Sequence, residues 1–149
     1  MFCPDRDRLV RQFMEFVQRD SPSGAEAPFV SALAGELEKL GLSVENDRSG
    51  ENGAGNLLAI FPGTNRSLRP ILLCMHTDTV EPGRGIRPRL EAGKIRSDGS
   101  TILGGDNKSA IAAALAGAQI RMANFRQTMP RMEEAFISLI GKIGEKEAA

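Results

Sequence analysis

The sequence has few residues of the kinds that mark some large protein classes. Only two cysteines occur in 149 residues, and Cys3 and Cys74 lie far apart, so we expect no disulfide framework. The position of Cys74 inside an apolar run predicts a buried thiol. No apolar run approaches the length that spans a bilayer. These shortages predict a cytoplasmic protein with no membrane partner.

An excess of either charge is also lacking. Nineteen basic residues balance nineteen acidic ones, so nucleic acid is not an expected partner. The length and a hydrophobic content of 41% fit one compact domain with a core, and the chain is too short for two ordinary domains. Function therefore has to be inferred from a site.

Three segments have the pattern of helices. From Asp7 to Arg19, apolar residues recur at helical spacing between charges, and Ser21 to Gly24 ends the helix. The same spacing from Phe29 to Leu40 predicts a second helix, with Gly41 as a left-handed cap. Ala110 to Ala118 is rich in alanine, isoleucine and leucine and predicts a tightly packed third helix.

Short apolar segments before the third helix predict strands. Leu42 to Glu45 alternates apolar and polar residues, and Asn56 to Phe61 follows a glycine-rich break. Ile71 to Met75 is an uninterrupted apolar run, which predicts a strand buried on both faces of a sheet. Glu81 to Leu103 carries scattered apolar points typical of a surface hairpin. Together the segments predict an α/β fold with a mostly parallel or mixed sheet flanked by helices.

The sequence changes character at Gln119. Residues 121–131 show no clean period and Pro130 interrupts them, whereas Met132 to Ile143 is amphipathic and predicts a terminal helix. We expect Glu145 to Ala149 to be frayed. The chain is therefore divided into residues 1–118, which form the domain, and residues 119–149, a diverged tail.

His76 is the only histidine, and it follows the predicted strand Ile71–Met75. The carboxyl ends of strands are where open α/β sheets bind ligands. Asp78, two residues further on, would lie on the same side and could fix the tautomer of a metal-bound imidazole. Two other interpretations stay open: His76 as a structural histidine, and Asp78 as the first residue of an Asx turn.

Asp106 is a second candidate for chemistry. It follows Gly104 and Gly105 and leads into the third helix, so its carboxylate lies on a loop whose backbone can approach a ligand closely. It could bridge two cations. It could equally cap the helix, in which case Lys108 would be an ordinary solvated side chain.

Three segments together resemble zinc exopeptidases similar to peptidase T, a group related to carboxypeptidase G and acetylornithine deacetylase. They are Asn56-Leu57-Leu58-Ala59-Ile60, His76-Thr77-Asp78-Thr79-Val80 and Asp98-Gly99-Ser100-Thr101-Ile102-Leu103-Gly104-Gly105-Asp106-Asn107-Lys108. The likeness covers roughly residues 5–118, including Asp20 to Gly24 and Gly83 to Gly93. It implies that residues 1–118 are the N-terminal part of a metallopeptidase catalytic domain.

The resemblance also implies roles for the site residues. His76 would bind one zinc ion, Asp106 would bridge two, and Asp78 would be the catalytic residue that orients His76. The peptide bond after Asp106 would be cis. The family carries Asp-Asp-Lys in this loop, whereas Asn107 is the middle residue here, which keeps the bridging ligand and removes a neighbouring charge. His76 and Asp106 would thus supply half of a dinuclear centre.

The reaction implied is hydrolysis of a peptide or amide bond, with release of the N-terminal residue of short peptides. A water held between two zinc ions would be deprotonated by a glutamate. The family's further acidic ligand and late histidine have no match. The only candidate pair for the glutamate, Glu133-Glu134, follows no buried strand and lacks the glycine expected after it, so we leave it out of the site. Its other interpretation is the charged face of a terminal helix.

Two functions remain open at this point. The first is a metallopeptidase of the aminopeptidase or tripeptidase kind, truncated and inactive as this chain, acting on short peptides, with a homodimer left open. The second is a non-catalytic remnant or an assembly module that retains the fold. A third possibility is that the tail comes from a frameshift or an internal deletion and has no selected function.

Overall fold

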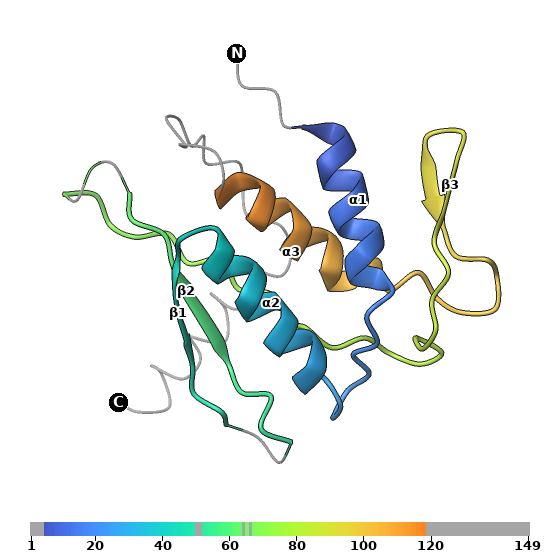
Figure 1. The fold of residues 1–149 in the computed structure, drawn as a ribbon, viewed down its shortest axis with the longest axis horizontal. Helices are drawn as coiled ribbons and strands as arrows, with labels where there is room; N and C mark the ends of the chain where they lie inside the picture. Colours follow the sequence, from blue (N-terminus) through green and yellow to red (C-terminus); the bar gives the residue numbers. More distant parts are fainter. Residues whose placement is uncertain (1–4, 50–51, 64, 66, 119–149) are drawn as a thin grey trace, which may run out of the picture.

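The computed structural model describes residues 5–49, 52–63, 65 and 67–118. The elements in chain order are α1 (Arg6–Val17), α2 (Ala27–Lys39), β1 (Ser43–Asn46), β2 (Leu57–Ile60), β3 (Arg89–Glu91), β4 (Lys94–Arg96) and α3 (Gly105–Ala118). In Figure 1, β1 and β2 lie beside α2 at one end of the molecule, and the small β3–β4 hairpin lies at the other end, beyond α1. Cys3 and the predicted terminal helix, with Glu133 and Glu134, lie outside the described residues.

The first two helices confirm the predictions from periodicity. The side chain of Asp5 caps α1 by accepting a hydrogen bond from the backbone N–H of Arg8 at 3.0 Å. Helix α2 has Pro28 in its first turn and ends before Gly41, whose φ of 77° is left-handed. The N–H of Gly41 donates to the carbonyl of Glu38 at 2.8 Å, which satisfies one of the free carbonyls at the helix end.

The core lies between the three helices and one face of the β1–β2 pair. Its buried members come from all three helices and are Phe16, Phe29, Leu33, Leu37, Ile111, Ala112 and Leu115. The rings of Phe16 and Phe29 meet edge to face with centroids 5.7 Å apart, a favourable aromatic geometry. Helix α3 packs against α1, and α2 packs against β1 and β2. No helix among the described residues is long and apolar enough to cross a membrane.

The helices and strands together confirm the α/β class. Both described strand pairs are antiparallel, however, and differ from the mostly parallel or mixed sheet predicted from the sequence, because the Ile71–Met75 segment supplies no further strand. In the first pair Val44 lies opposite Ala59, and both side chains pack against the core. In the second pair Leu90 lies opposite Ile95, which confirms the hairpin predicted between Glu81 and Leu103. The outward face of β2 carries Leu58, which is half exposed. The β1–β2 sheet is therefore covered by helices on one face.

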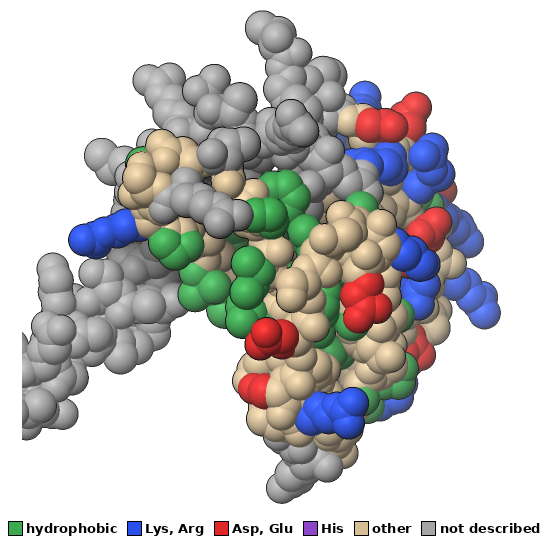
Figure 2. Space-filling model, turned by 60° about the vertical axis from the view of Figure 1, so that its left-hand side comes forward, with side chains coloured by type: hydrophobic (Ala, Val, Ile, Leu, Met, Phe, Trp, Pro, Cys, Tyr) green, Lys and Arg blue, Asp and Glu red, His purple; other side chains and the backbone are tan. Residues whose placement is uncertain are grey.

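The predicted strand at Ile71–Met75 is wrong. This segment forms no strand, and Ile71, Leu72 and Leu73 are 64%, 80% and 54% exposed. The predicted burial of Cys74 is wrong too, since this residue is exposed. A strand buried on both faces needs hydrogen-bonding neighbours and covering layers, and among the described strands β1 and β2 pair only with each other. In Figure 2 the left-hand side of the view in Figure 1 is turned forward, and exposed apolar side chains gather on that face.

Candidate functional site

The three candidate side chains meet beside the start of α3. The Nδ1 atom of His76 lies 3.1 Å from Oδ1 of Asp78 and 3.0 Å from the backbone oxygen of the same residue. The Nε2 atom lies 3.1 Å from Oδ1 of Asp106, thirty positions further along the chain. Each ring nitrogen of the imidazole therefore faces its own carboxylate. The side chains of His76, Asp78 and Asp106 are 48%, 35% and 90% exposed, so the arrangement is open to solvent.

The glycine loop before α3 brings Asp106 to the histidine. Gly104 has a φ of 67°, and a Cβ atom there would lie 3.0 Å from Cδ1 of Ile86 and 3.4 Å from Cγ2 of Thr79. Only glycine meets both conditions without strain. Asp106 itself is extended, with φ −91° and ψ 111°, and the peptide bond to Asn107 is cis, as the resemblance implied.

The segment between α1 and α2 holds the loop from His76 to Thr79, here called the histidine loop, in place. Ser21 is fully buried, and its hydroxyl donates to the carbonyl of Thr77 at 2.8 Å. The backbone N–H of Thr79 donates to the carbonyl of Ser21 at 2.8 Å, and Pro22 forms an isolated parallel bridge with Thr79. The sequence identified Ser21 only as part of a helix stop and of the Asp20–Gly24 segment of the resemblance, without a role of its own. Contacts across more than fifty positions leave no local signal that could have revealed its role.

Lys108 anchors the start of α3, so it is not the solvated side chain that the helix-cap interpretation of Asp106 implied. The residue is fully buried, its Nζ donates to the carbonyl of Arg19, and the ammonium lies 4.6 Å from the centroid of the Phe29 ring. Burial lowers the pKa of Lys108 to about 8, and the nearby negative charge of Asp20 opposes this shift. The polar and glycine neighbours of Lys108 in the sequence are typical of an exposed lysine, and no local pattern indicates that α1 and α2 cover it.

The charges of the site reinforce one another. Burial lowers the pKa of His76, but the Asp78 backbone, the hydrogen bond to Asp106 and both carboxylate charges raise it, and the net shift is upward. The pKa of Asp78 is lowered, first by the hydrogen bond from the Ser23 hydroxyl and then by His76, against the effect of burial. In the metal-free chain an ionised Asp78 therefore stabilises a protonated imidazole.

The distance between the facing ligand atoms fits a shared cation. Two ligands each about 2.0–2.2 Å from a tetrahedral zinc ion lie about 3.3–3.6 Å apart. The 3.1 Å between Nε2 of His76 and Oδ1 of Asp106 is slightly shorter, so a small movement apart would allow both atoms to bind one ion. The described part of the chain holds no group of three or more histidine, cysteine, aspartate or glutamate side chains placed to bind a metal. It provides two ligands of a site that ordinarily has at least three.

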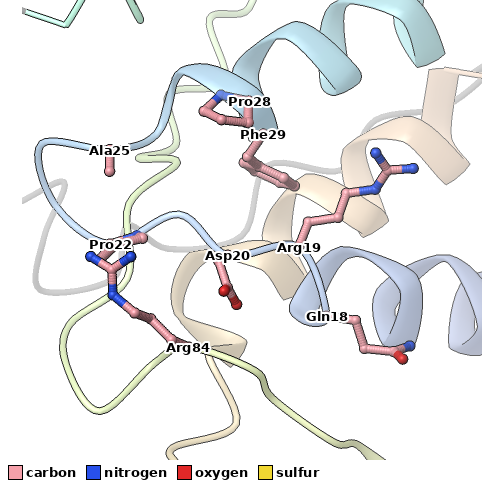
Figure 3. Close-up of a pocket in the computed structure, with 8 residues that line it drawn as sticks. All are labelled: Gln18, Arg19, Asp20, Pro22, Ala25, Pro28, Phe29 and Arg84. Atoms are coloured by element: carbon pink, nitrogen blue, oxygen red, sulfur yellow. The ribbon is translucent and has the colours of Figure 1, made fainter.

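A groove of about 310 Å³ opens beside these side chains. Its lining combines the three candidate residues with an apolar wall, and comprises His76, Asp78, Val80, Ile102, Leu103, Gly104, Gly105 and Asp106. A larger hollow of about 450 Å³ lies between the end of α1, the start of α2 and Arg84. Figure 3 shows Asp20 as the carboxylate among its lining side chains. Since this hollow contains none of the three candidate residues, we assign the chemistry to the smaller groove.

Comparison with known proteins places this site in context. No family model matches the chain. The uncharacterised protein YqjE of Bacillus subtilis (strain 168) is 39% identical over 109 residues, which are 71% of this chain and 29% of YqjE. Aminopeptidase PepT from Bacillus cereus ATCC 10987 superposes with a TM-score of 0.72 at 36% identity, over 77% of this chain and 32% of that one.

A tripeptidase from Staphylococcus aureus subsp. aureus Mu50 superposes with a TM-score of 0.70 at 35% identity, over 76% of this chain and 31% of that one. The chain thus spans about a third of the length of the proteins it matches. The likeness covers most of this chain in both sequence and backbone, as expected for part of a catalytic domain. The chain is therefore related in sequence and in fold to the PepT-type peptidases.

Proposed function

We propose that this chain forms part of a zinc-dependent peptidase that releases the N-terminal residue of short peptides. The observation that carries the proposal is the pair of atoms Nε2 of His76 and Oδ1 of Asp106, which face each other at 3.1 Å beside an apolar groove. The two solved structures compared above are peptidases, one described as an aminopeptidase and one as a tripeptidase. The site chemistry and the similar structures thus support the same reaction class.

In this proposal each residue has a distinct part. His76 would hold one ion through Nε2, and the carboxylate of Asp106 would be shared between two ions. Asp78 accepts the Nδ1–H of His76, which keeps the Nε2 lone pair free for the metal and raises its basicity. Bound zinc would polarise the peptide carbonyl and lower the pKa of a bound water. Val80 and Leu103 belong to the apolar wall of the groove beside the site.

His76 and Asp106 are two ligands, whereas catalytic zinc ordinarily has three protein ligands. The proposal therefore requires at least one further ligand, and a glutamate as general base, from outside the described residues. Without them we expect weak zinc binding and slow turnover.

The test measures zinc binding and peptide cleavage separately. Calorimetric titration of the metal-free chain with zinc should show a binding site that His76→Ala and Asp106→Asn both remove. Asp7→Asn, at an exposed position on α1, is the matched control and should bind zinc as the wild type does. Cleavage is followed as release of the N-terminal residue from a tripeptide. A wild-type chain that binds no zinc would contradict the proposed site.

A second candidate function is a non-catalytic assembly module. The observation that favours it is the exposed apolar run at Ile71–Leu73, which a soluble monomer rarely leaves uncovered. Zinc binding with no turnover of any short peptide would favour this candidate, whereas zinc-dependent turnover lost in His76→Ala would exclude it.

A further inference from the structure

The segment between α1 and α2 carries a side chain that the proposed function does not use. The hydroxyl of Ser23 donates to Oδ2 of Asp78 at 2.5 Å. The other carboxylate oxygen, Oδ1, lies 3.1 Å from Nδ1 of His76. The two oxygens of one carboxylate are thus divided between Ser23 and the histidine.

Ser23 is held in place by a tight turn. The N–H of Ala25 donates to the carbonyl of Pro22 at 2.8 Å, and Gly24 between them has a φ of 83°. A positive φ at the third position of a turn is what a type II turn requires, and glycine adopts it without strain. Figure 3 follows this segment from Gln18 at the end of α1 through Pro22 to Ala25. The turn therefore presents the hydroxyl of Ser23 from a fixed backbone.

The same segment is pinned to the histidine loop on its other side. The hydroxyl of buried Ser21 donates to the carbonyl of Thr77, and its carbonyl accepts from the N–H of Thr79, so these contacts flank Asp78. Ser23 and Asp78 consequently belong to two loops whose relative position is set by backbone contacts. The hydrogen bond between them can fix the rotation of the Asp78 carboxylate.

That rotation matters because two carboxylates compete for one proton. A neutral imidazole has a single N–H, which His76 can donate from Nδ1 to Asp78 or from Nε2 to Asp106, at 3.1 Å in both cases. Only the first tautomer leaves Nε2 with the lone pair that a metal ion needs. Whatever holds the Asp78 carboxylate toward Nδ1 therefore favours the metal-binding form.

We propose that Ser23 is a positioning residue that holds Asp78 in the orientation that keeps the proton of His76 on Nδ1. The proposal rests on the proposed function, because Nε2 matters only as a metal ligand. Ser23 is not itself among the residues that line the groove, and its hydroxyl donates to Asp78, so it acts on His76 through Asp78.

The first test uses the fact that His76 is the only histidine in the chain. In ¹⁵N-labelled, metal-free protein, at a pH where the imidazole is neutral, the two ring-nitrogen shifts report the tautomer without ambiguity. The wild type should carry its proton mainly on Nδ1. Ser23→Ala should move the population toward Nε2–H, and Ser23→Thr, which keeps a hydroxyl, should restore the wild-type balance.

The matched control is Ser31→Ala, an exposed serine on α2, which should leave the tautomer unchanged. Ser23 is itself exposed, so its replacement leaves the core intact, and equal thermal unfolding midpoints would verify this. A tautomer balance in Ser23→Ala equal to that of the wild type would overturn the proposal. So would a shift of the same size in Ser31→Ala.

The second test is zinc titration of the same variants. Loss of a residue that orients a metal-bound histidine typically weakens metal binding by about 10- to 100-fold, and we expect roughly tenfold for Ser23→Ala because it acts one residue further out. Equal zinc affinities of Ser23→Ala and a zinc-binding wild type would overturn the proposal. If the wild type binds no zinc, the proposed function fails, while the tautomer comparison in metal-free protein still decides the role of Ser23.

Discussion

Replacing Lys108 with methionine should change how the stability of this fold depends on pH. The lysine is fully buried at the start of α3, where it donates to the carbonyl of Arg19 and lies over the Phe29 ring. Burial lowers its pKa from 10.5 to about 8. Methionine keeps most of the length and apolar packing of the side chain but cannot be protonated, so the variant isolates the contribution of the charge.

The direction in which the free energy of unfolding changes with pH follows from proton binding in the folded and unfolded states. Between pH 8 and 10.5 the amine is neutral in the folded chain and protonated in the unfolded chain. Because the unfolded state then binds more protons, the free energy of unfolding rises with pH in this window. Below pH 8 both states are protonated, and the folded state bears the full cost of the buried charge. The shift corresponds to about 3 kcal/mol, at about 1.36 kcal/mol per pKa unit.

Two favourable contacts work against that cost. A hydrogen bond from a charged group contributes about 1.5–3 kcal/mol, and a desolvated cation over an aromatic ring about 2 kcal/mol. If the hydrogen bond to Arg19 and the Phe29 contact fully offset burial, the pKa of Lys108 would stay near 10.5. The pH dependence of stability therefore measures which effect is larger.

The assay is urea unfolding followed by circular dichroism at pH 7 and pH 10. For the wild type, Lys108 should add about 2–3 kcal/mol to the free energy of unfolding between these pH values, and Lys108→Met should lack this increment. Lys39→Met is the matched control, because this lysine is exposed on α2 and its loss should leave the increment in place. Equal changes with pH in the wild type and Lys108→Met would refute the depressed pKa.

Two further predictions concern the fold that supports the site. Leu33→Ala, at a core position that is 6% exposed, should lower the free energy of unfolding by about 2–5 kcal/mol, whereas Leu90→Ala, at an exposed hairpin position, should change it by less than about 1 kcal/mol. Similar urea midpoints for the two variants would contradict the assigned core. Gly104→Ala should destabilise the chain by at least about 1–2 kcal/mol, because φ is 67° and the new Cβ would lie 3.0 Å from Ile86. Gly63→Ala, where a Cβ meets nothing within 4 Å, is its control, and equal melting temperatures would refute the strain at Gly104.

Helical periodicity was enough to place α1 and α2, because each helix has one apolar face and local capping residues. The failure at Ile71–Met75 has a physical cause as well. An uninterrupted apolar run indicates that burying the segment would be favourable, but whether it is buried depends on neighbouring strands and covering layers. Among the described residues those neighbours are absent, so the same apolar residues lie on the surface.

From the sequence alone, spacing and residue type predicted the three described helices and the hairpin, whereas His76, Asp78 and Asp106 were assigned to one site by the resemblance to zinc exopeptidases. Only the tertiary structure decided that Lys108 is buried and that Ser23 reaches Asp78, 55 positions away. Such contacts depend on how α1, α2 and the histidine loop pack together, and no local pattern encodes them. The same packing turned His76 from an isolated histidine into an imidazole between two carboxylates.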